Sequence, residues 1–184
     1  MKNVVLIGDS IRMSYNEPVK ELLKDKALVR GPEENCRFAK YTLWSIKDWI
    51  GLGKENEADI IHWNNGIWDS FNISEDFECF TTLDDYIRDM KFILREMKKS
   101  KAQIIFATTT PVRRLLKNTN NERISQFNDA IVKVMKEEGI PINDLYSAVI
   151  DNVDEYIGDD YLHLSPKGVE VVSSQVAEFI GKYL

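Results

Sequence analysis

Val4-Val5-Leu6-Ile7-Gly8-Asp9-Ser10 is the stretch that decides the fold of this chain. Its first four residues form a continuous apolar run, which is typical of a strand buried on both faces of a parallel sheet. The run ends at a glycine, and two polar residues follow at once. We therefore expect Val4–Ile7 to be a central strand, with Ser10 at its carboxyl end.

Strand-like and helix-like segments alternate along the rest of the chain. Further strands are expected at Ala27–Val29, Asp59–Trp63, Gln103–Ala107 and Ile142–Tyr146. Helices are expected at Glu17–Lys24, Leu83–Ser100 and around Ile124–Val134, and another is expected to begin at Pro166. A further helix should follow Thr42 and carry Leu43, Ile46 and Ile50 on one face. The expected N-cap residues are Asn16, Thr42, Thr82 and Ser165. This alternation predicts an α/β fold, a three-layer α/β/α sandwich around a parallel sheet. We expect the flavodoxin-like strand order 2-1-3-4-5 and one domain, residues 1–184.

The composition is ordinary for a soluble globular protein. The 184 residues are 43% hydrophobic and 29% charged, with a formal net charge of -6. An acidic surface makes nucleic acid and anionic membranes poor partners. Cys36 and Cys79 are too few for a disulfide framework, and we expect both to be reduced. No apolar stretch is long enough to span a bilayer and no signal peptide is recognisable, so we expect a cytoplasmic protein.

Three polar segments lie where a sheet of this kind presents a site. Ser10 follows the first strand, the segment Asn64–Asp69 follows the third, and Asp160–His163 precedes the last helix. Ligands of open α/β sheets bind outside the carboxyl ends of the strands. These segments therefore hold the first candidates for function.

A serine hydroxyl in such a place is usually a turn or cap residue, and it becomes a nucleophile only with a base beside it. His163, in a polar loop, is the better base, whereas His62 lies in an apolar strand and is expected to be a core histidine. Asp160, three residues before His163, can orient the imidazole in a turn. Asp154 and Asp159 are competing carboxylates.

Other kinds of site have weaker support. The two histidines are far apart and the two cysteines lack ligand spacing, so we expect no metal and no cofactor. Thr108, Thr109 and Thr110 could contact the phosphate of a nucleotide or flavin, but the glycine pattern of such sites is absent. Arg12 and Arg37 lie near strand ends and, with Asn64, are candidates to bind a substrate, although an arginine in such a place is more often a plain surface residue.

Taken together, the three segments resemble the SGNH/GDSL hydrolase superfamily, the GDSL-like lipases and acylhydrolases, from Val4 to Gly168. The resemblance implies that Ser10 is the nucleophile, that His163 is its base and that Asp160 orients the base. It also implies that the Ser10 backbone amide is an oxyanion donor. The implied function is a serine esterase that cleaves small acyl esters through an acyl-enzyme. O-acetyl groups on carbohydrate are the first candidate for its small-molecule substrate.

Two blocks depart from the family pattern. Aligning Gly66 and Asp69 with the third block places Trp68 where the family has its oxyanion asparagine, so the donor there is Trp68, Asn65 or Asn64. In the second block a backbone N–H of Asn35 or Cys36 fits the spacing of the family glycine. The chain resembles a subgroup with Gly-Pro-Glu-Glu-Asn and Asn-x-Gly-Leu-His-Asp stretches, which has a variant third block.

Two alternatives to a small-ester hydrolase stay open. One is a lipid acylhydrolase of the lysophospholipase or thioesterase type. The other is a carbohydrate- or ligand-binding module on a catalytically weakened hydrolase scaffold. Tryptophans exposed in a cleft would support the binding module, while core packing is the plainer explanation for them. The tryptophans are Trp44, Trp49, Trp63 and Trp68.

Overall fold

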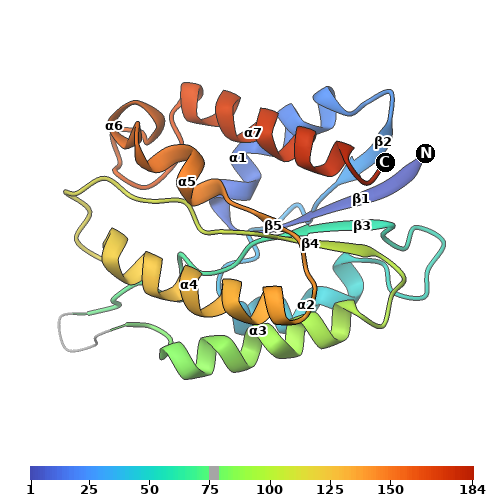
Figure 1. Cartoon of the computed structure of the whole chain (residues 1–184), viewed down its shortest axis with the longest axis horizontal. Helices are drawn as coiled ribbons and strands as arrows, with labels where there is room; N and C mark the ends of the chain where they lie inside the picture. Colours follow the sequence, from blue (N-terminus) through green and yellow to red (C-terminus); the bar gives the residue numbers. More distant parts are fainter. Residues whose placement is uncertain (75–78) are drawn as a thin grey trace.

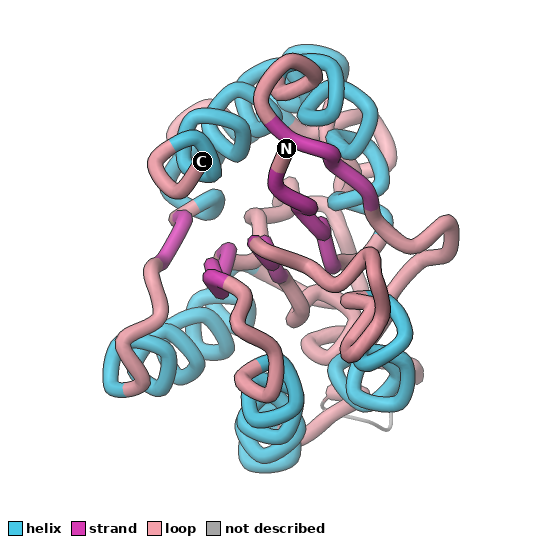
Figure 2. The backbone as a smooth tube through the Cα atoms, turned by 90° about the vertical axis from the view of Figure 1, so that its right-hand side faces the viewer, coloured by secondary structure: helices cyan, strands magenta, loops and turns pink. Residues whose placement is uncertain are grey.

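A parallel sheet forms the centre of the protein in the computed structural model, which describes residues 1–74 and 79–184 (Figure 1; Figure 2). The strands are β1 (Lys2–Ile7), β2 (Ala27–Arg30), β3 (Ile60–Trp63), β4 (Gln103–Ala107) and β5 (Ile142–Asn143). Neighbours follow in the order β2-β1-β3-β4-β5, and each pairing is parallel. The predicted fold class and strand order are confirmed.

Helices cover both faces of this sheet. They are α1 (Ser10–Leu22), α2 (Ala39–Trp49), α3 (Leu83–Met97), α4 (Asn121–Glu137), α5 (Leu145–Ile150), α6 (Val153–Tyr156) and α7 (Pro166–Gly181). Figure 1 shows α1 and α7 above the sheet and α2, α3 and α4 below it. Helix α1 packs on α7, and α2 packs on α3. These are the three layers that the alternation predicts.

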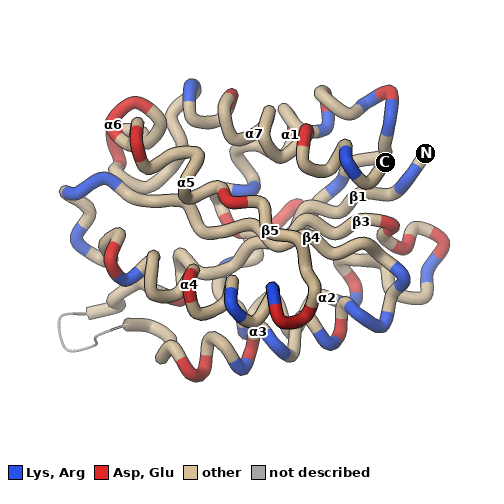
Figure 3. The backbone as a smooth tube through the Cα atoms, in the orientation of Figure 1, with Lys and Arg blue, Asp and Glu red and all other residues tan. Residues whose placement is uncertain are grey.

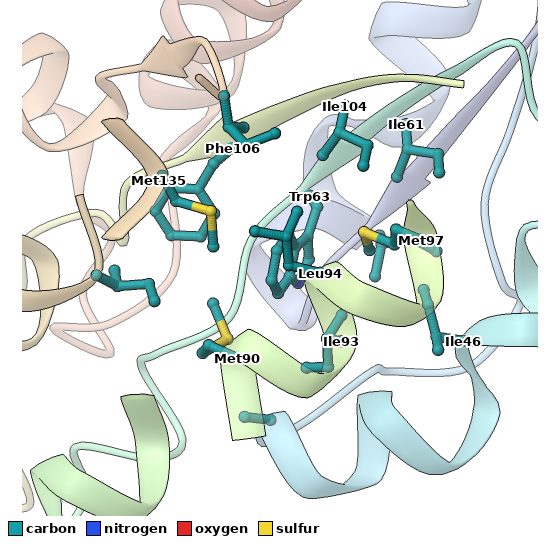
Figure 4. Packing of buried hydrophobic residues seen from close by; sticks show 14 of the residues in the cluster. Ile46, Ile61, Trp63, Met90, Ile93, Leu94, Met97, Ile104, Phe106 and Met135 are labelled. Atoms are coloured by element: carbon teal, nitrogen blue, oxygen red, sulfur yellow. The ribbon is translucent and has the colours of Figure 1, made fainter. Parts of the chain in front are cut away.

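Side chains of β1 alternate between the two cores. Val5 and Ile7 join the core under α2, α3 and α4, whereas Val4 and Leu6 join the core under α1 and α7. All four are fully buried, which explains why the strand is apolar throughout. In the first core the fully buried Trp63 lies edge-on to Phe106 (Figure 4), with the ring centroids 5.5 Å apart. Charged residues lie mainly on the helices and loops (Figure 3).

The first helix begins earlier than the sequence predicted. We expected Glu17–Lys24 after an Asn16 cap, but α1 starts at Ser10 and runs through Pro18. The Asp9 side chain is the cap, because it accepts a hydrogen bond from the Ile11 N–H. Burial of one face of α1 against α7 outweighs the backbone hydrogen bond that a proline removes.

Other element boundaries also differ. Thr42 caps no helix: α2 begins at Ala39, and the Thr42 hydroxyl instead donates to the Cys36 carbonyl at 3.0 Å. Strand β5 ends at Asn143, and the short helices α5 and α6, which were not predicted, follow it. The expected caps of α3 and α7 are confirmed, since Thr82 and Ser165 each accept a backbone N–H from the first turn. Within the described ranges, the helices are all too short or too polar to cross a membrane.

Candidate active site

Ser10 is presented by a tight turn at the carboxyl end of β1. The turn is Gly8 and Asp9, and Ser10 is already the first residue of α1. A Cβ at position 8 would lie 2.7 Å from the Arg12 Cβ, so only glycine fits there. The half-buried Ser10 side chain is thereby fixed at the central strand of the sheet, where ligands of such folds bind.

His163 lies between Ser10 and Asp160. Its Nε2 is 2.8 Å from the Ser10 Oγ, and its Nδ1 is 2.6 Å from the Asp160 Oδ2. These distances are within hydrogen-bond reach on both sides of the imidazole. The structure therefore brings together three side chains that are up to 153 positions apart in the sequence.

The loop before α7 sets the position of His163. Asp160 organises this loop, because its Oδ1 accepts the backbone N–H groups of Leu162 and His163 at 3.0 and 2.9 Å. The His163 carbonyl accepts the Gly158 N–H at 2.7 Å. Arg113, in the loop that follows β4, also holds this loop, since its backbone N–H donates to the Tyr161 carbonyl at 2.9 Å. Asp160 thus orients both the ring and the backbone of the histidine.

The Asp160 carboxylate is stabilised as an anion. Partial burial works to raise its pKa, but hydrogen bonds from the Leu162 N–H and from the side chain and N–H of His163 together lower the pKa to about 2. The competing carboxylates are elsewhere: Asp154 and Asp159 each lie 3.4 Å from the Arg113 guanidinium. Asp160 therefore stays ionised at every pH at which an imidazole titrates.

The two asparagines after β3 use their side chains inside the protein. Asn65 Nδ2 donates to the Arg37 carbonyl at 3.1 Å and to the Thr42 Oγ1 at 3.0 Å, while its Oδ1 accepts the Trp63 Nε1–H at 2.7 Å. Asn64 Nδ2 donates to the Ala107 carbonyl at 2.8 Å. The Asn65 amide therefore has both of its donors engaged, and the Asn64 amide is turned toward β4.

Trp68, at the position of the family asparagine, is 36% exposed. It borders a cavity of about 360 Å³. The other residues that line this cavity are Phe38, Phe71, Asn72, Ile73, Phe80 and Asn118. An indole N–H can donate one hydrogen bond, but the residues that line the cavity beside Trp68 are mainly apolar. The structure thus places Trp68 as an apolar wall.

Of the two candidate backbone donors after β2, one is already engaged. The Cys36 N–H donates to the Gly8 carbonyl at 3.2 Å, which joins this loop to the turn before Ser10. The Asn35 N–H has no hydrogen-bond partner in the described part of the chain. Asn35 Oδ1 accepts the Arg37 N–H at 2.7 Å, so the side chain helps to shape the loop. Of the two backbone N–H groups, that of Asn35 is therefore the one available to a ligand.

The remaining candidates differ in how exposed they are. Arg12 is 3% exposed and donates to backbone carbonyls, so it does not face a ligand as the sequence suggested. Arg37 is exposed and lies over the Tyr41 ring, 4.8 Å from its centroid. The threonines 108–110 are buried, and His62 is a core residue bonded to Asn143 as expected. Both cysteines are free.

Comparison with known proteins places this chain in a family. A model of the GDSL-like Lipase/Acylhydrolase family matches residues 45–171. The chain belongs to this family. As a GDSL-like acylhydrolase it is a hydrolase of ester bonds. A comparison with curated protein sequences gave no match.

Solved structures share the fold of this GDSL-like protein. A lipase/acylhydrolase from Enterococcus faecalis superposes with a TM-score of 0.83 at 20% identity, covering 100% of this chain and 97% of the other. A variant of an acetyl-xylooligosaccharide esterase from Geobacillus Stearmophilus gives 0.79 at 16% identity, covering 98% and 94%. A carbohydrate esterase family 3 protein from Talaromyces cellulolyticus gives 0.77 at 18% identity, covering 100% and 98%. At these identities the likeness establishes the architecture.

Sequence reasoning missed how this GDSL-like protein supports its third block. Asp69 is buried, and its two carboxylate oxygens accept the Ala39 N–H at 3.1 Å each, which ties the block to the start of α2. Burial raises the pKa of Asp69 to about 7, and these hydrogen bonds oppose the rise. Asn128 of α4 likewise bonds both the N–H and the carbonyl of Thr109. In the sequence, the sign of this contact is Asn128 itself, a polar residue on the otherwise apolar face of a helix.

Proposed function

We propose that this acylhydrolase is a serine esterase that cleaves small acyl esters through a Ser-His-Asp triad. The observation that carries the proposal is the unbroken hydrogen-bonded chain from Asp160 through His163 to Ser10, at 2.6 and 2.8 Å. A serine hydroxyl is a weak nucleophile, and a positioned base that is itself oriented by a carboxylate activates it.

In the first half of the reaction the Ser10 Oγ attacks the acyl carbonyl while His163 Nε2 takes the hydroxyl proton. The tetrahedral intermediate collapses, and His163 returns that proton to the departing alcohol. In the second half water attacks the acyl-enzyme while His163 takes a proton from the water, and His163 returns that proton to the Ser10 Oγ as the acid is released. Asp160 stays ionised and stabilises the imidazolium in both halves, in accord with its lowered pKa.

The developing oxyanion is held by the backbone N–H groups of Ser10 and Asn35. Ser10 is at the amino end of α1, where the first N–H groups have no partner within the helix. The unengaged Asn35 N–H supports a second donor. The two backbone donors do not depend on a third donor from a side chain. The side-chain amides of Asn64 and Asn65 are engaged in other hydrogen bonds, which argues against either of them as an oxyanion donor.

Acetyl esters of carbohydrate are the first substrate class to test. Structures with this fold include proteins named acetyl xylan esterase and acetyl-xylooligosaccharide esterase. The proposal is tested by measuring hydrolysis of p-nitrophenyl acetate and of acetylated xylo-oligosaccharides by the wild type and Ser10→Ala. We expect turnover of both by the wild type only. Equal rates for the two proteins would overturn the proposal, and ligand binding without turnover would favour the binding module.

A second candidate is an esterase for longer apolar acyl chains. The aromatic cavity beside Trp68, about 360 Å³ in volume, favours it because apolar walls stabilise apolar groups. A series of p-nitrophenyl esters from acetate to octanoate separates the two candidates. If the cavity holds the acyl chain, kcat/KM rises with chain length in the wild type and Trp68→Ala flattens the series. A rate that falls steadily beyond acetate supports the small-acyl esterase.

A further inference from the structure

The side chain of Arg12 joins the nucleophile turn to the loop that follows β2. It is 3% exposed, although arginine is rarely buried so completely. A guanidinium has five N–H donors, and five acceptors surround this one. The acceptors are the carbonyls of Gly8 (3.4 Å), Pro32 (3.0 Å) and Glu34 (2.8 Å), the Oδ1 of Asn16 (3.5 Å) and the Sγ of Cys36 (3.9 Å). None of them is a carboxylate.

The hydrogen bond to Glu34 determines the direction of the next N–H. The Glu34 carbonyl and the Asn35 N–H belong to one planar trans peptide group, so they point in opposite directions. Because the guanidinium holds the Glu34 carbonyl toward the interior, the Asn35 N–H must point out of the loop. The adjacent peptide is fixed too, since the Cys36 N–H donates to the Gly8 carbonyl at 3.2 Å.

Two glycines make room for this arrangement. A Cβ at position 8 would lie 2.7 Å from the Arg12 Cβ, and one at position 31 would lie 2.9 Å from the Arg12 Nη1. Both are far below an ordinary van der Waals contact. The Gly8 and Gly31 backbones are therefore packed directly against the arginine side chain, and the loop has little freedom to turn its peptides over.

We propose that Arg12 is a positioning residue that fixes the Glu34–Asn35 peptide so that the Asn35 N–H serves as an oxyanion donor. The inference rests on the proposed function, because it needs an oxyanion at Ser10. In this chain a buried arginine, rather than a glycine with its conformational freedom, sets the geometry of the second donor.

The test compares Arg12→Lys with Arg30→Lys. Arg30 is the matched control, because it too donates to two backbone carbonyls, Trp49 O at the end of α2 (2.7 Å) and Asn56 O in the loop that leads into β3 (2.8 Å). A lysine ammonium cannot bridge several carbonyls as a guanidinium does. We expect Arg12→Lys to lower kcat about 10²-fold, which is the effect of losing one oxyanion donor. The KM should change less than about threefold. Arg30→Lys should leave kcat within about twofold.

Phenylboronic acid gives a second readout, because its tetrahedral adduct with Ser10 places an oxygen in the oxyanion hole. Its Kd should rise in Arg12→Lys by the factor that kcat/KM falls, and not in Arg30→Lys. Unchanged kcat in Arg12→Lys, or equal losses in the two lysine variants, would overturn the inference. Ser10→Ala, run alongside, keeps the cases apart: if it retains wild-type activity, the proposed function itself has failed.

Asn35→Pro and Asn35→Ala keep the inference testable if Arg12→Lys does not fold. Both lose the side chain, but only proline lacks the N–H. We expect kcat of Asn35→Pro to be at least about tenfold below that of Asn35→Ala. Equal rates for folded forms of the two would show that the Asn35 N–H is not the donor.

Discussion

Two groups of loops meet at Ser10, and they use their polar groups in opposite ways. The loop before α7 aims its polar side chains at the serine, with Asp160, His163 and Ser10 in one hydrogen-bonded line. The loop after β3 turns the amides of Asn64 and Asn65 inward to backbone carbonyls, and Arg12 of α1 donates in the same way to a carbonyl of the loop after β2. These loops therefore offer a ligand the backbone N–H of Asn35 and the apolar cavity beside Trp68.

Under the proposed mechanism, this difference shows how one scaffold can keep a serine nucleophile while the side chains around its oxyanion hole change. The triad depends on particular side chains, because only they can move a proton. A backbone donor depends only on the conformation of its peptide, which any buried anchor can hold. Asn64, Asn65 and Arg12 can therefore serve as such anchors.

The largest effects should come from the side that aims at Ser10. His163→Ala and Asp160→Asn should each lower kcat by about 10⁴-fold, because the base is lost in one and wrongly oriented in the other. Steady-state hydrolysis of p-nitrophenyl acetate measures both. Asp159→Asn is the control, since this neighbouring carboxylate is exposed and faces Arg113. A rate for Asp160→Asn close to that of Asp159→Asn would remove Asp160 from the triad.

Asn65 should behave as a structural residue on the other side. Asn65→Ala leaves the Arg37 carbonyl, the Thr42 hydroxyl and the Trp63 indole N–H without their partner, so the free energy of unfolding should fall by about 1–3 kcal/mol or more. We expect kcat to fall less than about tenfold. Urea unfolding and steady-state rates give the two numbers, with the exposed Asn152→Ala as control. A 10²-fold loss of kcat at unchanged stability would make Asn65 a direct oxyanion donor.

The smallest effect concerns His62, the histidine that takes no part in the site. Burial lowers the pKa of His62 from 6.5 to about 3, so the folded protein keeps this ring neutral while the unfolded chain protonates it below pH 6.5. The stability that neutral His62 contributes is therefore complete above pH 6.5 and is lost as the pH falls toward 3.

Comparison of the wild type with His62→Gln isolates this contribution, because Asp9 and Asp69, whose pKa values are raised by burial, are present in both proteins. The stability advantage of the wild type should shrink by up to about 1.4 kcal/mol per pH unit below pH 6.5. Urea unfolding at pH 5 and pH 7 measures it. A constant difference between the two pH values would mean that folded His62 titrates normally.

The sheet, its strand order and the pairing of Asp160 with His163 follow from the sequence alone. The apolar run Val4–Ile7 can be satisfied only by burial on both faces, and the caps Thr82 and Ser165 act within three residues of their partners. The spacing of Asp160 and His163 is local in the same sense, because a turn of three residues brings the carboxylate to the imidazole. Such short-range features can be predicted from the sequence without knowledge of the fold.

Which hydrogen-bond donors remain free follows from the tertiary contacts and not from the sequence. Asn65 meets Arg37 across 28 positions, and Arg12 meets Glu34 across 22, so neither pairing leaves a periodic signal in the sequence. The same holds for α1, whose early start at Ser10 depends on a cap by Asp9 and on burial against α7. An amide or guanidinium has the same chemistry wherever it lies. Whether it faces a ligand or a carbonyl is set by long-range packing.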